Sequence, residues 1–129
     1  MSSASFILVV DDHPVNLKLI RVLLQAEGYE VRVATDAAEA LRILDSALPR
    51  LILMDIQLPD IDGLELTRRL KADPRTSAIP IVAITAYAMK GDEERMLEAG
   101  CVSYVAKPID TRGLCALVAG VLSSEDVDT

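Results

Sequence analysis

The segment Leu51-Ile52-Leu53-Met54-Asp55 decides the expected fold, because a short apolar run ends there in a carboxylate. Three further apolar runs end in polar side chains: residues 7–10 in Asp11-Asp12, residues 81–84 in Thr85, and residues 104–106 in Lys107. Runs of this kind are typical of parallel strands that are buried on both faces. The carboxyl ends of parallel strands meet at one edge of the sheet, where open α/β proteins bind their ligands. We therefore expect the acids, the hydroxyl and the amine to converge at that edge.

Strand-like and helix-like segments alternate along the chain, which predicts βα units around one parallel sheet. The expected strands cover residues 6–10, 30–34, 51–55, 81–84 and 103–106, and helices begin near Pro14, Asp36, Asp62, Met89 and Asp110. Short right-handed crossovers leave few topologies, and the strand order 2-1-3-4-5 is a common doubly wound solution. We predict an α/β, doubly wound (βα)5 three-layer sandwich with a parallel five-stranded sheet of this flavodoxin-like order.

The expected helices differ in their capping signals and in the number of apolar residues that can pack against the sheet. Two helix starts match the capping-box pattern: Asp36 with Glu39, and Asp62 with Glu65. The helix expected at 89–99 offers only Met89, Met96 and Leu97 as large apolar residues among charged ones. Weak packing would make it the element most easily moved. An ordinary surface helix with a thin apolar stripe is the alternative.

Composition limits the class of protein. The chain has 129 residues and 51% hydrophobic content, enough for one domain with a buried core. We expect that domain at 6–122, after a frayed N-terminus at 1–5 and before a frayed acidic tail at 123–129. The net charge of −7 disfavours direct binding to nucleic acid. No apolar run approaches the about 20 residues that span a bilayer, and no signal peptide is recognisable, so we expect a cytoplasmic protein without membrane insertion.

The acid cluster calls for a cation. Three carboxylates brought together repel one another, and Lys107 supplies only one positive charge against them. Mg²⁺ is a hard ion that binds a few carboxylates and recruits phosphate oxygens, and Mn²⁺ is an alternative. Asp55 is therefore either a metal ligand or a nucleophile that forms an acyl phosphate. For Asp11-Asp12, a polar turn that caps the following helix remains the plainer alternative.

At this point the chain resembles a response-regulator receiver domain, of the kind that histidine kinases phosphorylate. The resemblance covers about residues 6–122 and rests on motifs spaced by whole βα units: Val9-Val10-Asp11-Asp12, Met54-Asp55, Leu58-Pro59-Asp60-Ile61-Asp62-Gly63, Ile84-Thr85-Ala86 and Val105-Ala106-Lys107-Pro108. Residues 86–92 look like the equivalent stretch of stand-alone cell-cycle receivers and of hybrid-kinase receivers.

The resemblance implies a role for each residue of the cluster. Asp55 would accept the phosphoryl group. The implied Mg²⁺ ligands are Asp12, Asp55 and the backbone carbonyl of Gln57, with Asp11 acting through water. The other implied assignments are catalysis by Thr85 and Lys107, a switch that couples Thr85 to Tyr104, a cis peptide at Lys107-Pro108, and tuning of the phosphorylated lifetime by Gln57 and Tyr87. His13 is interpreted as a helix-start residue rather than a base.

The resemblance also implies partners rather than an enzymatic activity. The donor would be a histidine kinase or a His phosphotransfer protein. A downstream protein would bind the face formed by the helix at 89–99, the strand at 103–106 and the last helix, and the same face would support a monomer or weak dimer. Two alternatives stay open: a degenerate receiver that only binds a partner, and a receiver fragment of a hybrid histidine kinase.

Two other classes fit less well, and the thiols suggest no metal. A haloacid-dehalogenase-like phosphatase wants a second Asp two residues after its nucleophile, where this chain has Gln57. A flavodoxin-like electron carrier wants a phosphate loop after the first strand, where Asp11 and Asp12 would repel the FMN phosphate. Cys101 and Cys115 are interpreted as reduced thiols that pack as small hydrophobes.

Overall fold

The computed structural model describes residues 6–86 and 90–127. Its elements are β1 (Ile7–Val10), α1 (Pro14–Ala26), β2 (Val31–Ala34), α2 (Ala37–Ser46), β3 (Leu51–Asp55), α3 (Gly63–Ala72), β4 (Ile81–Thr85), α4 (Lys90–Ala99), β5 (Ser103–Ala106) and α5 (Thr111–Val127). All neighbouring strands are parallel, in the order β2-β1-β3-β4-β5. The predicted α/β class and strand order are confirmed.

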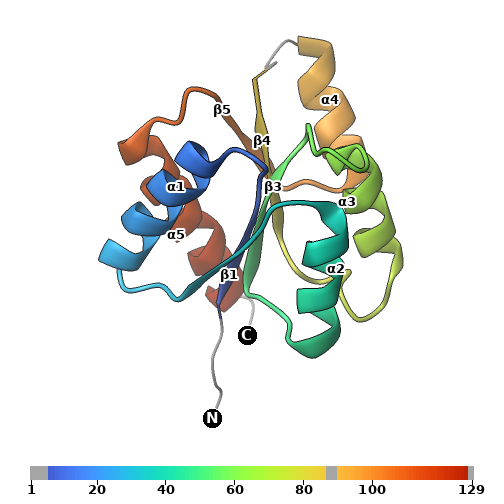
Figure 1. Cartoon of the computed structure of the whole chain (residues 1–129), viewed down its shortest axis with the longest axis horizontal. Helices are drawn as coiled ribbons and strands as arrows, with labels where there is room; N and C mark the ends of the chain where they lie inside the picture. Colours follow the sequence, from blue (N-terminus) through green and yellow to red (C-terminus); the bar gives the residue numbers. More distant parts are fainter. Residues whose placement is uncertain (1–5, 87–89, 128–129) are drawn as a thin grey trace.

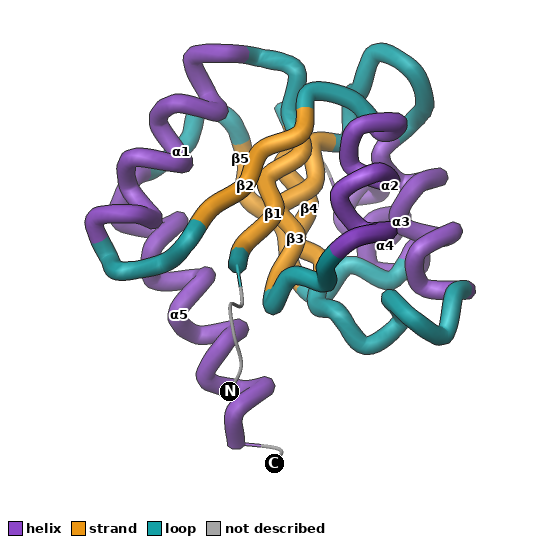
Figure 2. Tube along the Cα trace, turned by 60° about the horizontal axis from the view of Figure 1, so that its bottom comes forward, coloured by secondary structure: helices purple, strands orange, loops and turns teal. Residues whose placement is uncertain are grey.

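Helices cover both faces of the sheet. Figures 1 and 2 show α1 and α5 on one side, and α2, α3 and α4 on the other. Alternate residues of each strand serve opposite faces: Ile7 and Val9 belong to the core under α1 and α5, whereas Leu8 and Val10 belong to the core under α2, α3 and α4. The three-layer sandwich follows from this alternation.

The central strands are buried along their whole length, and the edge strands are not. Every residue of β1, β3 and β4 is buried, whereas β2 is buried only at its two ends and β5 is half-buried to exposed. A chain with one Phe, three Tyr and no Trp builds these cores mainly from aliphatic side chains, with Phe6 buried among them. Close packing on both faces holds the carboxyl ends of the central strands in defined positions.

The capping signals are half formed. The Asp36 side chain accepts a hydrogen bond from the Glu39 backbone N–H at 2.8 Å, as in a capping box. The Glu39 carboxylate, however, accepts from the backbone N–H and hydroxyl of Thr35 instead of from the Asp36 N–H. At α3, Asp62 accepts from the Leu64 N–H, one residue earlier than the pattern requires.

A second aspartate caps α2 from a distant loop. The two carboxylate oxygens of Asp60 accept the backbone N–H groups of Ala37 and Ala38, each at 3.0 Å. These donors belong to the first turn of a helix, where no intrahelical acceptor exists. The loop after β3 is thereby tied to the start of α2, and this contact was not predicted from the sequence.

The last helix is longer than expected. It continues past residue 122 to Val127, whereas fraying of the acidic tail from residue 123 stays a prediction. The helix continues because neither Gly nor Pro lies between residues 121 and 127 to end it. The expected frayed N-terminus at 1–5, the end of the tail at 128–129 and Met89 lie outside the described residues.

Two further observations bear on the expectations. Within the described part of the chain, no helix is long and apolar enough to cross a membrane. Cys101 is buried, Cys115 is half-buried, and both are free thiols, as predicted. Burial raises the pKa of both thiols, so neither is poised as a reactive thiolate.

Candidate functional site

The strand register brings the expected polar residues to one edge. Val10 lies beside Met54, Asp55 beside Ile84, and Thr85 beside Ala106. The residues that follow, Asp11 after β1 and Lys107 after β5, therefore emerge at the same end of the sheet. Because the strands are parallel and in register, Asp11, Asp55, Thr85 and Lys107 lie at the ends of adjacent strands.

Asp55 lies at the centre of this edge and is 1% exposed. Its Oδ1 accepts the Gln57 backbone N–H at 2.9 Å, and its Oδ2 accepts the Lys107 ammonium at 3.0 Å. Burial raises the pKa of the Asp55 carboxyl, and the charge of Asp11 adds to this. The Gln57 N–H and Lys107 oppose the rise. The site thus holds a carboxylate that is short of solvation.

Asp11 is fully buried beside it. Its Oδ1 accepts the His13 backbone N–H at 2.9 Å. Its Oδ2 is a buried oxygen with no hydrogen-bond partner among the described residues, 4.0 Å from the Lys107 nitrogen. A buried carboxylate oxygen without a partner is costly, so this atom points to a ligand that the site is built to receive.

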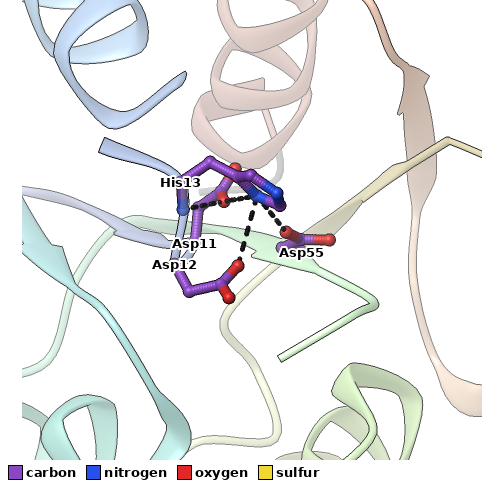
Figure 3. A group of neighbouring side chains, drawn as sticks. All are labelled: Asp11, Asp12, His13 and Asp55. Carbon is purple, nitrogen blue, oxygen red and sulfur yellow. Dashed lines mark hydrogen bonds and ion pairs between the residues drawn. The ribbon is translucent and has the colours of Figure 1, made fainter. Parts of the chain in front are cut away.

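The His13 imidazole lies over the acids. Its Nδ1 is 3.1 Å from Asp11 Oδ1, 3.2 Å from Asp12 Oδ1 and 3.8 Å from Asp55 Oδ2, as Figure 3 shows. His13 is also the residue that precedes α1, with Pro14 in the first turn, so its interpretation as a helix-start residue is confirmed. Its ring contacts were missed, although its position directly after the acid pair was a signal for them.

The donor set fits a divalent cation. Asp11, Asp12, His13 and Asp55 each offer a ligand atom, and these atoms lie within 4.8 Å of one another. The Lys107 ammonium lies beside the Asp55 and Asp11 carboxylates, and one buried Asp11 oxygen lacks a hydrogen-bond partner in the described part of the chain. The Asp12 side chain is 36% exposed, which leaves the cluster open to solvent on that side. Residues of this charge and chemistry suit a hard ion such as Mg²⁺.

The loop after β3 is held against the acceptor position. Gln57 forms an isolated bridge with Asp62, and the Gly63 N–H donates to the Ile56 carbonyl at 2.7 Å. A Cβ atom on Gly63 would overlap the carbonyl oxygen of Asp55 and the Cα of Ile56. Glycine is therefore required at position 63 for this close approach.

Thr85 and Tyr104 lie on the same face of the sheet. Tyr104 pairs with Ala83 and Thr85 pairs with Ala106, so strand alternation directs both side chains toward α3 and α4. Thr85 is buried, and Tyr104 is half-buried against the core on this face. Tyr87 lies outside the described residues. The peptide bond between Lys107 and Pro108 is cis, the configuration that the resemblance implied.

A cavity opens beside this edge, between the loop after β3 and α4. Its volume is about 410 Å³, and its lining includes Gln57, Thr85, Arg95 and Met96. Thr85 brings the carboxyl end of β4 into that lining. The space next to the acceptor edge is thus bounded by a helix with few buried side chains, as the burial pattern of α4 shows.

The sheet order and the acid cluster at its carboxyl edge define a doubly wound α/β domain with a cation-binding type of site. The chain belongs to the response regulator receiver domain family, whose model matches residues 7–119. This match confirms the predicted family. Receivers of this family are regulatory signalling domains of two-component systems.

The relatives agree in sequence and in structure. The chain is 48% identical over 103 residues to the polar-differentiation response regulator DivK of Brucella anthropi, a match that spans 80% of this chain and 84% of that relative. A CheY-like receiver from Methanospirillum hungatei superposes with a TM-score of 0.89 at 31% identity, over 98% of this chain and 100% of that one.

A third similar structure holds a metal. The receiver domain of the sensor histidine kinase PA1611 from Pseudomonas aeruginosa matches with a TM-score of 0.84 at 36% identity, over 94% of this chain and 99% of that one. In that structure a magnesium ion is coordinated in the active site cleft.

Proposed function

We propose that this receiver is a phosphorylation-dependent switch that accepts a phosphoryl group on Asp55 from a histidine kinase or a His phosphotransfer protein. The observation that carries the proposal is the setting of Asp55. Its carboxylate is buried at the end of the central strand, and one of its oxygens accepts a hydrogen bond from Lys107. It lies beside an acid pair in which one buried oxygen has no hydrogen-bond partner among the described residues. A group that only stabilised the fold would not be placed among like charges.

The proposed reaction is phosphoryl transfer to a carboxylate. An oxygen of Asp55 forms a bond to phosphorus as the P–N bond of the donor phosphohistidine breaks, and the electron pair of that bond returns to the imidazole nitrogen. The Lys107 ammonium, 3.0 Å from Asp55 Oδ2, stabilises negative charge on the transferring group. The Gln57 N–H holds the other carboxylate oxygen in place.

Mg²⁺ fits this site, with Mn²⁺ as an alternative. The proposed ligands are Asp12, Asp55 and the backbone carbonyl of Gln57, with Asp11 acting through a water molecule. The ion would neutralise charge on the phosphoryl oxygens and lower the repulsion among the carboxylates. The Asp11 oxygen without a hydrogen-bond partner in the described residues and the exposed side of Asp12 are the structural support for this ligand set.

The switch would follow from the added charge. A phosphoryl group brings roughly 1.5 to 2 negative charges and new acceptor oxygens. Thr85 and Lys107 are the donors proposed for them, and each charge-assisted hydrogen bond contributes about 1.5–3 kcal/mol. Converting a two-state element from 1:99 to 99:1 needs about 5.5 kcal/mol, which two such bonds supply at the upper end of this range and three supply near its middle. Thr85 would move toward the phosphate, Tyr104 would fill the vacated space, and α4 would shift into the cavity beside it.

The proposed output surface is the face formed by α4, β5 and α5, through which a downstream protein would bind and a weak dimer would form. Leu97 of α4 and Val102, directly before β5, are each 49% exposed. Gln57 and Tyr87 are proposed to tune the lifetime of the phosphorylated state. A cytoplasmic protein that does not bind nucleic acid directly is consistent with the net charge of −7.

Phosphorylation by a small-molecule donor tests the proposal. The protein is incubated with acetyl phosphate and Mg²⁺, and its intact mass is measured. We expect a single phosphoryl adduct in the wild type, none in Asp55→Asn, and an undiminished adduct in Asp45→Asn, which alters an exposed acid of α2. Absence of an adduct in the folded wild type would favour a degenerate receiver that only binds a partner. An adduct that persists in Asp55→Asn would place the acceptor elsewhere.

The switch itself needs a structural measurement. Backbone amide shifts are compared with and without a phosphoryl mimic in the presence of Mg²⁺. We expect changes at the strand ends, in α4 and around Tyr104, and few in α2. Changes confined to the strand ends would contradict the proposed movement of α4.

A further inference from the structure

We propose that Asp60 is a positioning residue for phosphoryl transfer to Asp55, because it ties the loop that carries Gln57 to the start of α2. The inference rests on the proposed function and extends it to a residue outside the acid cluster. Asp60 acts through the backbone of Gln57 and touches neither the ion nor the phosphoryl group.

The first support is the set of hydrogen bonds that the Asp60 side chain accepts. Its Oδ1 accepts the backbone N–H groups of Ala37 and Ile61, and its Oδ2 accepts that of Ala38, each at 3.0 Å. The hydrogen bond from Ala37 is the main cause that lowers the pKa of the Asp60 carboxyl. The group is therefore ionised at neutral pH, and its negative charge suits the start of a helix. One side chain thus joins the loop after β3 to the first turn of α2.

The second support is the contrast between the two sides of this loop. On one side lies α2, which is capped at its start and anchored in the core by Leu44. On the other side lies the cavity of about 410 Å³, whose lining includes Gln57, Leu58 and Asp62. A loop with a packed helix on one side and open space on the other relaxes most readily toward the space. The hydrogen bonds of Asp60 oppose that movement.

The third support is what the loop carries. The Gln57 N–H donates to Asp55 Oδ1 at 2.9 Å, and the Gln57 carbonyl is a proposed Mg²⁺ ligand. Both are backbone groups, so the placement of the loop, and not the Gln57 side chain, sets their direction. Gln57 also forms a bridge with Asp62, so a displaced loop takes residue 57 with it.

Apolar contacts hold the same loop in a different way. Leu58 and Ile61 are half-buried against the core. Such contacts are non-directional, whereas hydrogen bonds depend on angle. We therefore expect the loss of Asp60 to tilt the loop without unfolding it. Groups that orient a metal ligand typically change metal affinity or activity by about 10–100-fold when they are removed.

Asp36 provides a matched control. It caps the same helix by accepting the Glu39 N–H at 2.8 Å, but it belongs to the helix side of the contact. Loss of either cap should cost a similar part of the stability. A role in stability alone therefore predicts the same behaviour from Asp36→Ala and Asp60→Ala, whereas a positioning role predicts that only Asp60→Ala changes the site. Asp60→Asn keeps one acceptor oxygen and should lie between the wild type and Asp60→Ala.

Amide exchange gives a readout without metal or phosphoryl donor. Exchange of the Gln57 N–H is measured by NMR in Mg²⁺-free buffer. We expect it to be about tenfold faster than wild type in Asp60→Ala and within about threefold of wild type in Asp36→Ala, because only Asp60→Ala frees the loop. Equal exchange rates in the two variants would overturn the inference.

Metal affinity and phosphorylation complete the test. Mg²⁺ is titrated into each protein, and its dissociation constant is taken from the amide shifts. We expect a rise of at least about tenfold in Asp60→Ala and of less than about threefold in Asp36→Ala. At saturating Mg²⁺, the initial rate of adduct formation with acetyl phosphate should fall about tenfold in Asp60→Ala only. An unchanged Mg²⁺ affinity in Asp60→Ala would overturn the inference.

The two proposals fail separately. If Asp60→Ala and Asp36→Ala behave alike, the inference about Asp60 is lost, while phosphorylation of Asp55 stands. If the folded wild type takes no phosphoryl group in Mg²⁺, the proposed function is lost, and the exchange and Mg²⁺ measurements still decide whether Asp60 positions Gln57.

Discussion

Helices α2 and α4 are both ten residues long and cover the same face of the sheet. They differ in their capping hydrogen bonds and in the number of side chains that they bury. At its start, α2 donates backbone hydrogen bonds to the side chains of Asp36 and Asp60, and it buries Ala37, Ala40 and Leu44. Across residues 91–99 of α4, the buried side chains are Met96 and Ala99. The remaining side chains in that span are mainly charged.

The two helices also differ in how they contact the loop after β3. The cap from Asp60 fixes the loop after β3 to α2, whereas the cavity of about 410 Å³ separates that loop from α4. One side of the candidate site is therefore anchored and the other side has room. A switch needs a fixed frame and a movable part, and this asymmetry provides both within one layer of helices.

Removing the main anchor of α2 should have the largest effect. Leu44 is 2% exposed, and Leu44→Ala deletes buried methyl groups and leaves a cavity. We expect it to lower the free energy of unfolding by about 3 kcal/mol. Urea unfolding followed by far-ultraviolet circular dichroism measures it. The matched variant Leu97→Ala on α4, where the side chain is 49% exposed, should cost less than about 0.5 kcal/mol. Equal losses would remove the distinction between the two helices.

Hydrogen exchange should separate the helices in the unmodified protein. Local opening of α4 breaks few buried contacts, whereas opening of α2 also breaks two side-chain caps. We expect the amides in the middle of α4 to exchange about a hundredfold faster than those of α2, which corresponds to about 2.7 kcal/mol. Native-state exchange followed by NMR measures the rates. Comparable protection would mean that α4 is held by contacts other than its buried side chains.

The caps should each contribute a smaller amount. We expect Asp36→Ala and Asp60→Ala to lower the free energy of unfolding by about 1 kcal/mol each, since each leaves first-turn N–H groups without an acceptor. As a control, Asp92→Ala on α4 removes a surface ion pair with Arg95 and should cost less than about 0.5 kcal/mol. A negligible effect of Asp60→Ala would show that the loop after β3 is held by other contacts.

The pH dependence of stability should be the smallest effect. Hydrogen bonds from Ala37 lower the pKa of Asp60, and those from Thr35 lower the pKa of Glu39. Carboxyls with a lowered folded pKa stabilise above their unfolded pKa, and this stability is lost as the pH falls through the folded value. Both groups lie at the surface, so we expect the loss to be a few tenths of a kcal/mol.

Asp55 should act in the opposite direction. Because burial raises its folded pKa, its ionisation opposes folding, and the associated stability falls as the pH rises through that pKa. Urea midpoints between about pH 3 and 7 for wild type, Asp60→Asn and Asp55→Asn separate the two signs. Asp60→Asn should flatten the acid loss, and Asp55→Asn should steepen it. The same slope in all three proteins would contradict both assignments.

The fold was predictable because apolar runs and turn residues are local signals. The decisive features were the four runs that end in Asp11, Asp55, Thr85 and Lys107, and their convergence follows from parallel strands alone. The thin anchoring of α4 was also readable, since its charged residues leave few apolar positions. These conclusions need no knowledge of which loops meet.

The contacts that were missed join segments whose meeting is not encoded locally. Asp60 caps a helix that begins 23 residues earlier in the chain, and its sequence motif does not reveal that helix as its partner. The ring of His13 lies over the acids from the position directly before α1, whose first residue is Pro14. Both depend on how the elements are placed in space, which periodicity does not report.

Gly63 has a consequence for exchanging parts between receivers. Its missing side chain lets α3 start against the backbone of Asp55, so the acceptor, the loop and the first turn of the helix occupy one continuous space. A loop transferred from another protein would have to include the whole stretch 55–63. A junction inside that stretch would separate the acceptor from the helix start that packs against it. The smallest exchangeable module of this domain is thus larger than its visible loop.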